Sequence, residues 1–133
     1  MHGASFFDTN VLVYFAVQGT PRANRAAELV ESGGTINVQV LNEFTNVARS
    51  KMRMEWGEIA DTLQFMRNLL EVEPLTLEVH DLALAVAERH NLHIYDATIV
   101  AAAIEAGCST LYTEDMHHGL VVNGQLRLVN PFV

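Results

Sequence analysis

The sequence predicts an α/β fold, a three-layer α/β/α sandwich with a mostly parallel central sheet, and three observations support this class. Short apolar segments alternate with longer segments of helical periodicity along the chain. The first hairpin signal is Asn123-Gly124, near the end, so earlier strands are expected to be joined through helices. Half of the 133 residues are hydrophobic and 18% are charged, which suffices for a packed core. No linker composition interrupts residues 1–133, so we expect a single domain.

The first half of the chain begins with a short buried strand at 4–8, followed by an apolar stretch that ends near Gly19. Pro21 suits the first turn of a helix, and small apolar residues give that helix a stripe up to Gly33-Gly34. A second strand is expected at 35–38. Apolar residues then recur at helical spacing between positions 40 and 48.

The second half continues the alternation. Residues 56–70 show the clearest helical pattern in the chain, since Trp56 and five later apolar residues follow the same spacing. The remaining expected elements are a weak strand at 72–75, a helix around 79–86, an Ala-rich helix at 96–106 closed by Gly107, and strands at 109–113 and 126–129.

Composition also bears on where the protein works. Cys108 is the only cysteine, so no intramolecular disulfide can form, and a reducing compartment is expected. The N-terminus lacks the basic segment of a secretion signal, and no apolar run approaches the roughly 20 residues that span a bilayer. We therefore expect a cytoplasmic protein without a membrane partner.

The net charge of −8 disfavours nucleic-acid binding when taken alone, because phosphate binding draws on Lys and Arg. Its distribution weakens that objection. Residues 1–70 carry six basic and seven acidic side chains, whereas residues 71–133 carry two basic and nine acidic ones. A basic surface beside an acidic pocket is compatible with this pattern.

Four carboxylates stand at positions that are unusual for solvated surface. Asp8 closes the first strand and Asp115 follows the strand at 109–113, so both should emerge at the carboxyl edge of the sheet. Asp96 opens the Ala-rich helix, and Glu43 falls within an apolar helix, where a carboxylate is costly unless something pairs with it. Each has an ordinary alternative as a helix cap, a turn residue or part of a polar helix stripe.

The four acids together favour a metal site. Carboxylates gathered at one edge repel and raise one another's pKa unless a cation holds them ionised. Oxygen ligands without nitrogen or sulfur partners suit Mg²⁺ or Mn²⁺. Such an ion can activate water for attack on a phosphodiester, and the sequence allows either one ion or two.

These segments resemble those of a known family, the PIN-domain ribonucleases, and within it the VapC-type toxins of toxin–antitoxin pairs. The resemblance spans nearly the whole chain, in order, and rests on Phe6-Phe7-Asp8-Thr9-Asn10-Val11-Leu12, Glu43, Tyr95-Asp96-Ala97 and Leu111-Tyr112-Thr113-Glu114-Asp115-Met116. No single piece is specific, but the ordered set of four is.

The resemblance implies a metal-dependent endoribonuclease, the toxin of a type II toxin–antitoxin system. Its catalytic and metal-binding positions carry over to Asp8, Glu43, Asp96 and Asp115, and its accessory polar positions to Asn10 and Thr113. Glu114 is a secondary candidate, because it should point away from Asp115 if strand geometry continues. Further implications are a homodimer, an RNA substrate, and a cognate antitoxin that places a basic side chain near the acids. For RNA binding we expect contributions from the basic residues Arg22, Arg25, Arg49 and Lys51.

Two alternatives stay open at this point. A haloacid-dehalogenase-like phosphatase also begins with a strand followed by Asp, but it requires a second Asp where this chain has Asn10, and a later lysine, whereas the only lysine is Lys51. A receiver domain fails for similar reasons. The other alternative is a catalytically silent PIN-like binding module that keeps the acids without cleaving RNA.

Overall fold

The computed structural model describes residues 4–133, and its core is a six-stranded sheet with the order β3-β2-β1-β4-β6-β5. The strands pair in parallel, except that β5 runs antiparallel to β6 at one edge. Their bounds are β1 Ser5–Phe7, β2 Thr35–Asn37, β3 Glu71–Glu73, β4 Thr110–Tyr112, β5 Val121–Val122 and β6 Leu126–Val129. The predicted mostly parallel sheet is confirmed.

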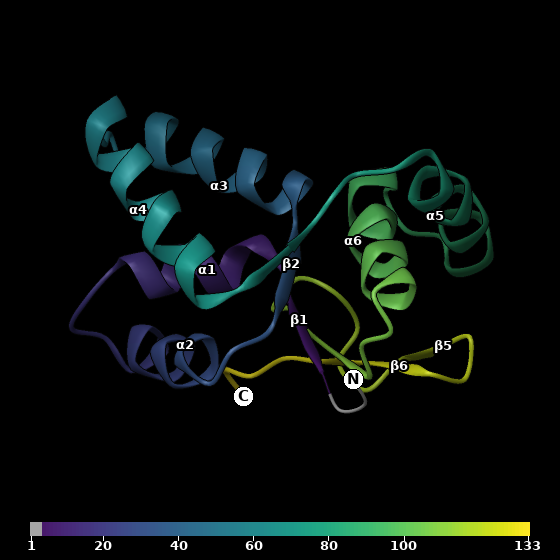
Figure 1. Ribbon diagram of the computed structural model, residues 1–133. Helices are drawn as coiled ribbons and strands as arrows, with labels where there is room; N and C mark the ends of the chain where they lie inside the picture. Colours follow the sequence, from purple (N-terminus) through teal and green to yellow (C-terminus); the bar gives the residue numbers. More distant parts are fainter. Residues whose placement is uncertain (1–3) are drawn as a thin grey trace.

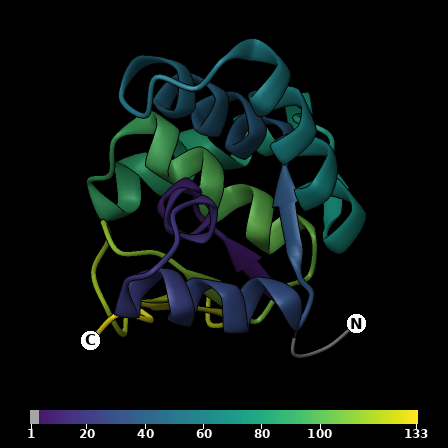
Figure 2. The ribbon, with the colours of Figure 1, turned by 90° about the vertical axis from the view of Figure 1, so that its left-hand side faces the viewer.

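Within residues 4–133, six helices pack around the sheet. They are α1 Thr9–Ala16, α2 Pro21–Glu31, α3 Val38–Ser50, α4 Trp56–Leu69, α5 Leu77–His90 and α6 Ile94–Glu105. Figure 1 shows α1 and α2 on one side of the sheet and the α5–α6 pair on the other, while the α3–α4 pair stands beside α1. The quarter-turn view in Figure 2 shows α2 and the α3–α4 pair at opposite ends of the molecule. The predicted α/β/α sandwich is therefore confirmed.

The core lies between these layers, and α6 is its most buried helix. Seven consecutive residues, from Ala97 to Ala103, are buried in α6, which packs on β2 and β4 as well as on α5. Small alanine side chains allow that close packing. Phe6 and Phe7 of β1, whose side chains point to opposite faces of the sheet, are both almost completely buried. The central strand β1 thus lies between buried surfaces, as its continuous apolar sequence predicts.

The elements named from the sequence lie within a few residues of the observed ones, whereas α1 was expected only as an apolar stretch and β5 was not named. Two further differences are instructive. The Ala-rich helix begins at Ile94 instead of 96, because His93 is its N-cap and accepts a hydrogen bond from the Tyr95 amide. Asp96 therefore lies inside the first turn. Trp56 matches the apolar spacing of α4 but is 60% exposed, because it stands at the helix start, where the Arg49 guanidinium lies over its ring.

The predicted hairpin turn at Asn123-Gly124 is confirmed. Both residues have positive φ, 53° and 67°, and they join β5 to β6. A turn with two left-handed residues matches the twist of an antiparallel pair, which explains the preference for Asn-Gly there.

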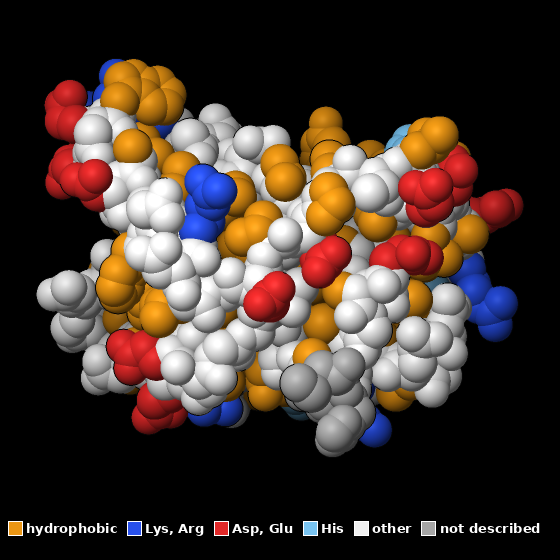
Figure 3. Space-filling model, in the orientation of Figure 1, with side chains coloured by type: hydrophobic (Ala, Val, Ile, Leu, Met, Phe, Trp, Pro, Cys, Tyr) orange, Lys and Arg blue, Asp and Glu red, His pale blue; other side chains and the backbone are white. Residues whose placement is uncertain are grey.

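Across residues 4–133, no helix combines the length and the apolar character that crossing a membrane requires. Figure 3 shows that acidic side chains are more widespread than basic ones on the face it displays, and that hydrophobic side chains reach the surface there. The exposed large hydrophobic residues include Trp56, Phe65, Leu75, Leu77, Leu84 and Tyr95.

Candidate active site

Asp8 lies at the carboxyl end of β1, where the chain turns into α1. Its side chain is the N-cap of α1, and Oδ1 accepts a hydrogen bond from the Thr9 amide at 2.7 Å. The other oxygen, Oδ2, accepts from the Thr113 hydroxyl, also at 2.7 Å. Asp8 is only 5% exposed. The cap role considered from the sequence is thus real, and the second oxygen faces the neighbouring strand end.

Asp115 reaches the same edge from the segment that follows β4. Thr113 is buried at the end of this strand, and its hydroxyl oxygen accepts the Asp115 amide at 3.2 Å. Asn10 of α1 donates from Nδ2 to Asp115 Oδ2 at 3.0 Å. Since β1 and β4 are adjacent and parallel, the two strand-end acids meet at one edge, as predicted.

Glu43 lies on α3, and its side chain contacts the start of α1. Asn37 at the end of β2 caps α3 by accepting the Val40 amide, which fixes the start of the helix at the sheet edge. Glu43 Oε1 accepts from the Thr9 hydroxyl at 2.6 Å, and Oε2 accepts from Gln39 Nε2 at 3.1 Å. Gln39 also donates to the Tyr95 carbonyl at 3.0 Å, linking α3 to the start of α6.

Asp96 completes the set from the first turn of α6. Burial raises its pKa above the ordinary range, and the nearby Asp115 and Glu43 carboxylates raise it further, while His93 lowers it. The positive end of the helix dipole favours a carboxylate at this position.

All four acids line one cavity of about 420 Å³. The other lining residues come mainly from α1 and α3: Thr9, Asn10, Val13, Tyr14, Asn46 and Val47. Among the described residues that line it there is no Lys, Arg or His. Burial raises the pKa of Asp8 to about 6, an effect that hydrogen bonds from Thr113 and Thr9 oppose and that Glu43 and Asp96 reinforce. The described lining therefore gathers carboxylates without a cationic side chain among them.

The carboxylates are near one another but do not yet form a ligand shell. Within residues 4–133, no three His, Cys, Asp or Glu side chains are grouped closely enough to hold a metal ion as they stand. Oxygens of Asp8, Glu43 and Asp115 instead accept hydrogen bonds from neutral donors on Thr9, Asn10, Gln39 and Thr113. This arrangement partly compensates the charges while leaving them beside a shared space.

The accessory residues divide into two groups. Asn10 lines the cavity and Thr113 contacts Asp8, so both lie where the sequence placed them. Glu114 points elsewhere. Its carboxylate accepts a hydrogen bond from the Tyr14 hydroxyl at 2.9 Å and forms an ion pair with Arg22.

The four basic residues expected to bind RNA belong to two separate helical regions. On α2, Arg22 is paired with Glu114, and Arg25 contacts Glu28 and the Pro131 carbonyl. Near the end of α3, Arg49 donates to the Met54 carbonyl, and Lys51 is exposed. Arg49 and Lys51 follow Glu43 on the same helix and its cap, which leads away from the acid cavity.

Sequence reasoning missed several polar residues around the acids. Thr9 and Gln39 donate to Glu43, and Tyr14 and Asn46 line the cavity. Gln39 and Asn46 did carry a signal, because they lie four residues before and three residues after Glu43 and so share its helix face. The Thr9 contact carried no signal, since it joins residues 34 apart in sequence.

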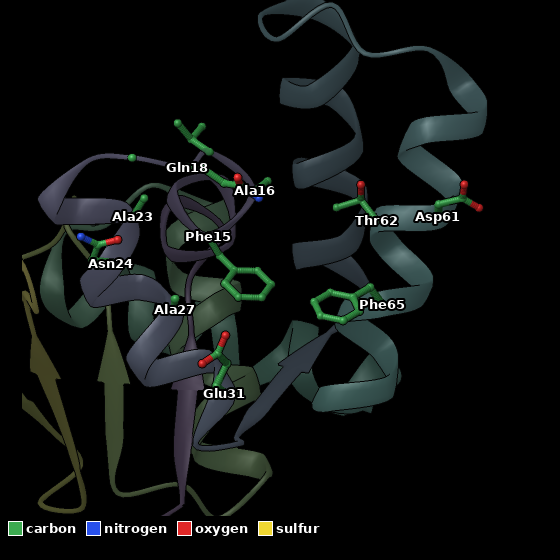
Figure 4. Close-up of a pocket in the computed structure, with 12 residues that line it drawn as sticks. Phe15, Ala16, Gln18, Ala23, Asn24, Ala27, Glu31, Asp61, Thr62 and Phe65 are labelled. Carbon is green, nitrogen blue, oxygen red and sulfur yellow. The ribbon is translucent and has the colours of Figure 1, made fainter.

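A larger cavity of about 650 Å³ lies on the other side of α1. It is bounded by the end of α1, the loop after it, α2 and α4. Figure 4 shows Phe15 and Phe65 facing each other across this groove, with Glu31 and Asp61 at its margins. The two rings are stacked, with centroids 6.1 Å apart and an interplanar angle of 4°. Phe65 is nevertheless 54% exposed, so this groove presents aromatic surface to solvent.

The family model described as the PIN domain matches residues 5–119 of this chain. The chain belongs to the PIN domain family. This assignment agrees with the resemblance drawn from the four acidic segments. No match was found among curated proteins.

Solved structures share the fold of this PIN domain at low sequence identity. VapC20 from Mycobacterium tuberculosis, described as a sarcin–ricin loop cleaving toxin, aligns with a TM-score of 0.69 and 21% identity, covering 84% of this chain and 90% of the other. A toxin–antitoxin complex from Klebsiella pneumoniae gives a TM-score of 0.72 at 18% identity, covering 96% and 98%. VapBC2 from Rickettsia felis, bound to a DNA fragment from its promoter, gives 0.67 at 21% identity, covering 98% and 100%. The fold is that of VapC toxins.

Proposed function

We propose that this PIN-domain protein is a metal-dependent endoribonuclease that hydrolyses RNA phosphodiester bonds. One observation carries the proposal. Asp8, Glu43, Asp96 and Asp115 come from four separate elements and line one cavity at the carboxyl edge of the sheet. The cost of assembling unpaired carboxylates there is explained when they serve a cation and a phosphodiester.

The donor chemistry of the cavity fits Mg²⁺ or Mn²⁺. Four carboxylates supply hard oxygen ligands, and the described residues of the lining include no cationic side chain that would compete with a metal ion. Asp8, Glu43, Asp96 and Asp115 are the residues that would hold it. A bound ion would lower the pKa of a water molecule and neutralise charge on the leaving oxygen.

The polar neighbours orient the acids. Thr113 and the Thr9 amide each fix one oxygen of Asp8, so this carboxylate keeps a defined direction. The Thr9 hydroxyl and Gln39 do the same for Glu43, and Asn10 does so for Asp115. Such outer partners hold ligand side chains in place and typically change metal affinity by about 10- to 100-fold.

RNA is the substrate that this proposal assigns, and basic residues outside the acid cavity would bind its backbone. Arg49 and Lys51 lie on α3 or its cap, the helix that carries Glu43, and their phosphate contacts would make binding sensitive to salt. Arg22 and Arg25 belong to the same predicted set. The description of the structurally similar VapC20 as a sarcin–ricin loop cleaving toxin supports this choice of substrate.

The same proposal includes a protein partner. We infer that the chain is the toxin of a type II toxin–antitoxin system, works in the cytoplasm and forms a homodimer. Similar folds occur in a toxin–antitoxin complex and in VapBC bound to DNA, which supports an antitoxin partner. The groove with Phe15 and Phe65 offers exposed aromatic surface for a segment of that antitoxin.

The decisive experiment sequences the RNA ends produced when the protein is expressed without a partner and, in parallel, incubates purified protein with the same RNA and Mn²⁺ or EDTA. Asp96→Asn should abolish defined ends in both assays while keeping the fold. Asp81→Asn is the matched control, because Asp81 is exposed on α5.

The alternative of a silent binding module makes the opposite prediction. Wild type, Asp96→Asn and Asp81→Asn would then leave RNA equally intact, and Mn²⁺ would not raise the melting temperature of the wild type. That pair of results would end the nuclease proposal.

A further inference from the structure

The segment from Thr113 to Asp115 lies outside regular secondary structure, although it presents one of the four acids to the cavity. Its position depends on side chains from α1 and on Thr113. A single amide group, that of Asn10, accepts the Glu114 amide at 3.3 Å through Oδ1 and donates to Asp115 Oδ2 at 3.0 Å through Nδ2. Anything that moves Glu114 therefore moves the peptide to which Asp115 is attached.

The Glu114 side chain is not part of the cavity lining and contacts one aromatic and one basic residue instead. Tyr14 of α1 donates its hydroxyl to Glu114 Oε1 at 2.9 Å, and Arg22 of α2 pairs with Oε2. The Arg22 guanidinium lies over the rings of Tyr14 and Phe132, 5.4 Å from each centroid. Tyr14 and Phe132 also pack edge to face, with centroids 4.9 Å apart.

We propose that Arg22 and Glu114 are positioning residues that together hold Asp115 at the acid cavity. The pair joins α2 to the segment after β4, across 92 residues of sequence, and Tyr14 and Phe132 fix the guanidinium plane against it. This inference rests on the proposed function, because Asp115 is useful only as a ligand or catalytic group there. It also gives Glu114 a role that does not require it to enter the cavity.

The pairing changes what Arg22 is expected to do. A guanidinium that binds RNA phosphate acts through its positive charge, so removing Glu114 would free that charge and strengthen RNA binding. If Arg22 and Glu114 instead act together as a clamp that holds the segment from Thr113 to Asp115 in place, the expected result is different. Losing either partner releases the same segment, so Arg22→Met and Glu114→Gln should change the protein in the same direction. The two roles therefore predict opposite signs for Glu114→Gln.

The experiment measures Mn²⁺ affinity by electron paramagnetic resonance and RNA cleavage kinetics for Arg22→Met, Glu114→Gln and the double variant. Each single variant should weaken Mn²⁺ binding and lower kcat by about 10-fold, the lower end for partners that orient a metal ligand, with the KM for RNA unchanged. The double variant should lose no more than either single one, because both remove the same clamp. Tyr14→Phe, which keeps the ring but loses the donor to Glu114, should show a smaller loss in the same direction.

Controls separate the clamp from general charge effects. Glu28→Gln removes an exposed carboxylate that is paired with an arginine on α2, and Arg89→Met removes an exposed arginine of α5. Neither should change Mn²⁺ affinity. A higher KM for Arg22→Met together with a lower KM for Glu114→Gln would overturn the clamp and return Arg22 to RNA binding.

A separate measurement distinguishes failure of the clamp from failure of the nuclease proposal. If wild type neither binds Mn²⁺ nor cleaves RNA, hydrogen exchange of the Glu114 and Asp115 amides still tests the clamp. Exchange that is faster in both single variants but unchanged in Glu28→Gln supports a clamp on this segment. Unchanged exchange in Arg22→Met and Glu114→Gln overturns it.

Discussion

Two cavities lie beside α1, and the smaller of them holds the more reactive side chains. The larger groove, about 650 Å³, is built from the surfaces of α1, α2 and α4, and Phe15 and Phe65 stack across it. The smaller cavity, about 420 Å³, collects four carboxylates from four elements and surrounds them with hydroxyl and amide donors. Size alone would select the groove. The chemistry of the lining selects the acid cavity.

The difference follows from how each cavity is made. A groove can form wherever two helices diverge, and no polar side chains need to meet there. Its presence therefore reflects only how the helices pack. Carboxylates that gather in a half-buried place must lower their charging cost through hydrogen bonds or a cation. The acid cavity therefore stores free energy that a ligand can release. The groove exposes apolar surface that a partner chain can cover.

The largest expected effect concerns the charge of Asp8. Its ordinary pKa is 3.8, and burial raises it to about 6 in the folded protein. Below pH 3.8 the group is protonated in both states. As pH rises toward 6 the unfolded chain ionises first, so the metal-free folded state loses up to about 3 kcal/mol relative to a protein without this group.

Urea unfolding in EDTA at pH 4 and pH 7 measures this effect. Asp8→Asn should not lose stability in this way as pH rises. The difference between its free energy of unfolding and that of wild type should therefore be larger at pH 7 than at pH 4. Asp61→Asn, at the margin of the groove and exposed, should follow wild type. A gap that is the same at both pH values would show that Asp8 does not carry an unfavourable charge.

A smaller effect is expected at Thr113, whose hydroxyl donates to Asp8 and lowers the pKa of that carboxyl. Thr113→Val keeps the shape but removes the donor, so the pKa of Asp8 should rise above about 6, and activity near neutral pH should fall by about 10-fold. Carbon-13 NMR titration of the Asp8 carboxyl measures the shift directly. Thr113→Ser retains the hydroxyl and should titrate like wild type. An unshifted titration in the valine variant would contradict this role.

The acids were predictable because their signals are local. Asp8 and Asp115 follow apolar strands, Asp96 opens a buried helix, and Glu43 interrupts an apolar helix face, so each position is visible in a short window of sequence. The topology then brings them to one edge, since β1 and β4 are parallel neighbours. The fold class was predictable for the same reason, from alternating strand and helix periodicity.

The contacts that organise the site were not predictable, because they depend on distances between elements. Thr9 and Glu43 are joined across 34 residues, and Arg22 and Glu114 across 92. Arg22 illustrates the limit well. By sequence it is one of a few basic residues in an acidic protein and so appears free to bind phosphate, whereas the structure pairs it with a carboxylate and stacks it on two rings.

An effect of similar size tests the other half of the comparison, the groove as the surface for a partner chain. Phe65→Ala should weaken binding of the cognate antitoxin by about 10-fold, since a half-exposed aromatic side chain contributes roughly 1–2 kcal/mol when a partner covers it. Isothermal titration calorimetry with a purified cognate antitoxin measures the change. Leu84→Ala is the matched control, because Leu84 is similarly exposed, at 52%, but lies on α5 across the sheet. Equal weakening by both variants would mean that the antitoxin does not distinguish the groove from other apolar surface, and the aromatic pair of Phe15 and Phe65 would then serve only to pack α1 against α4.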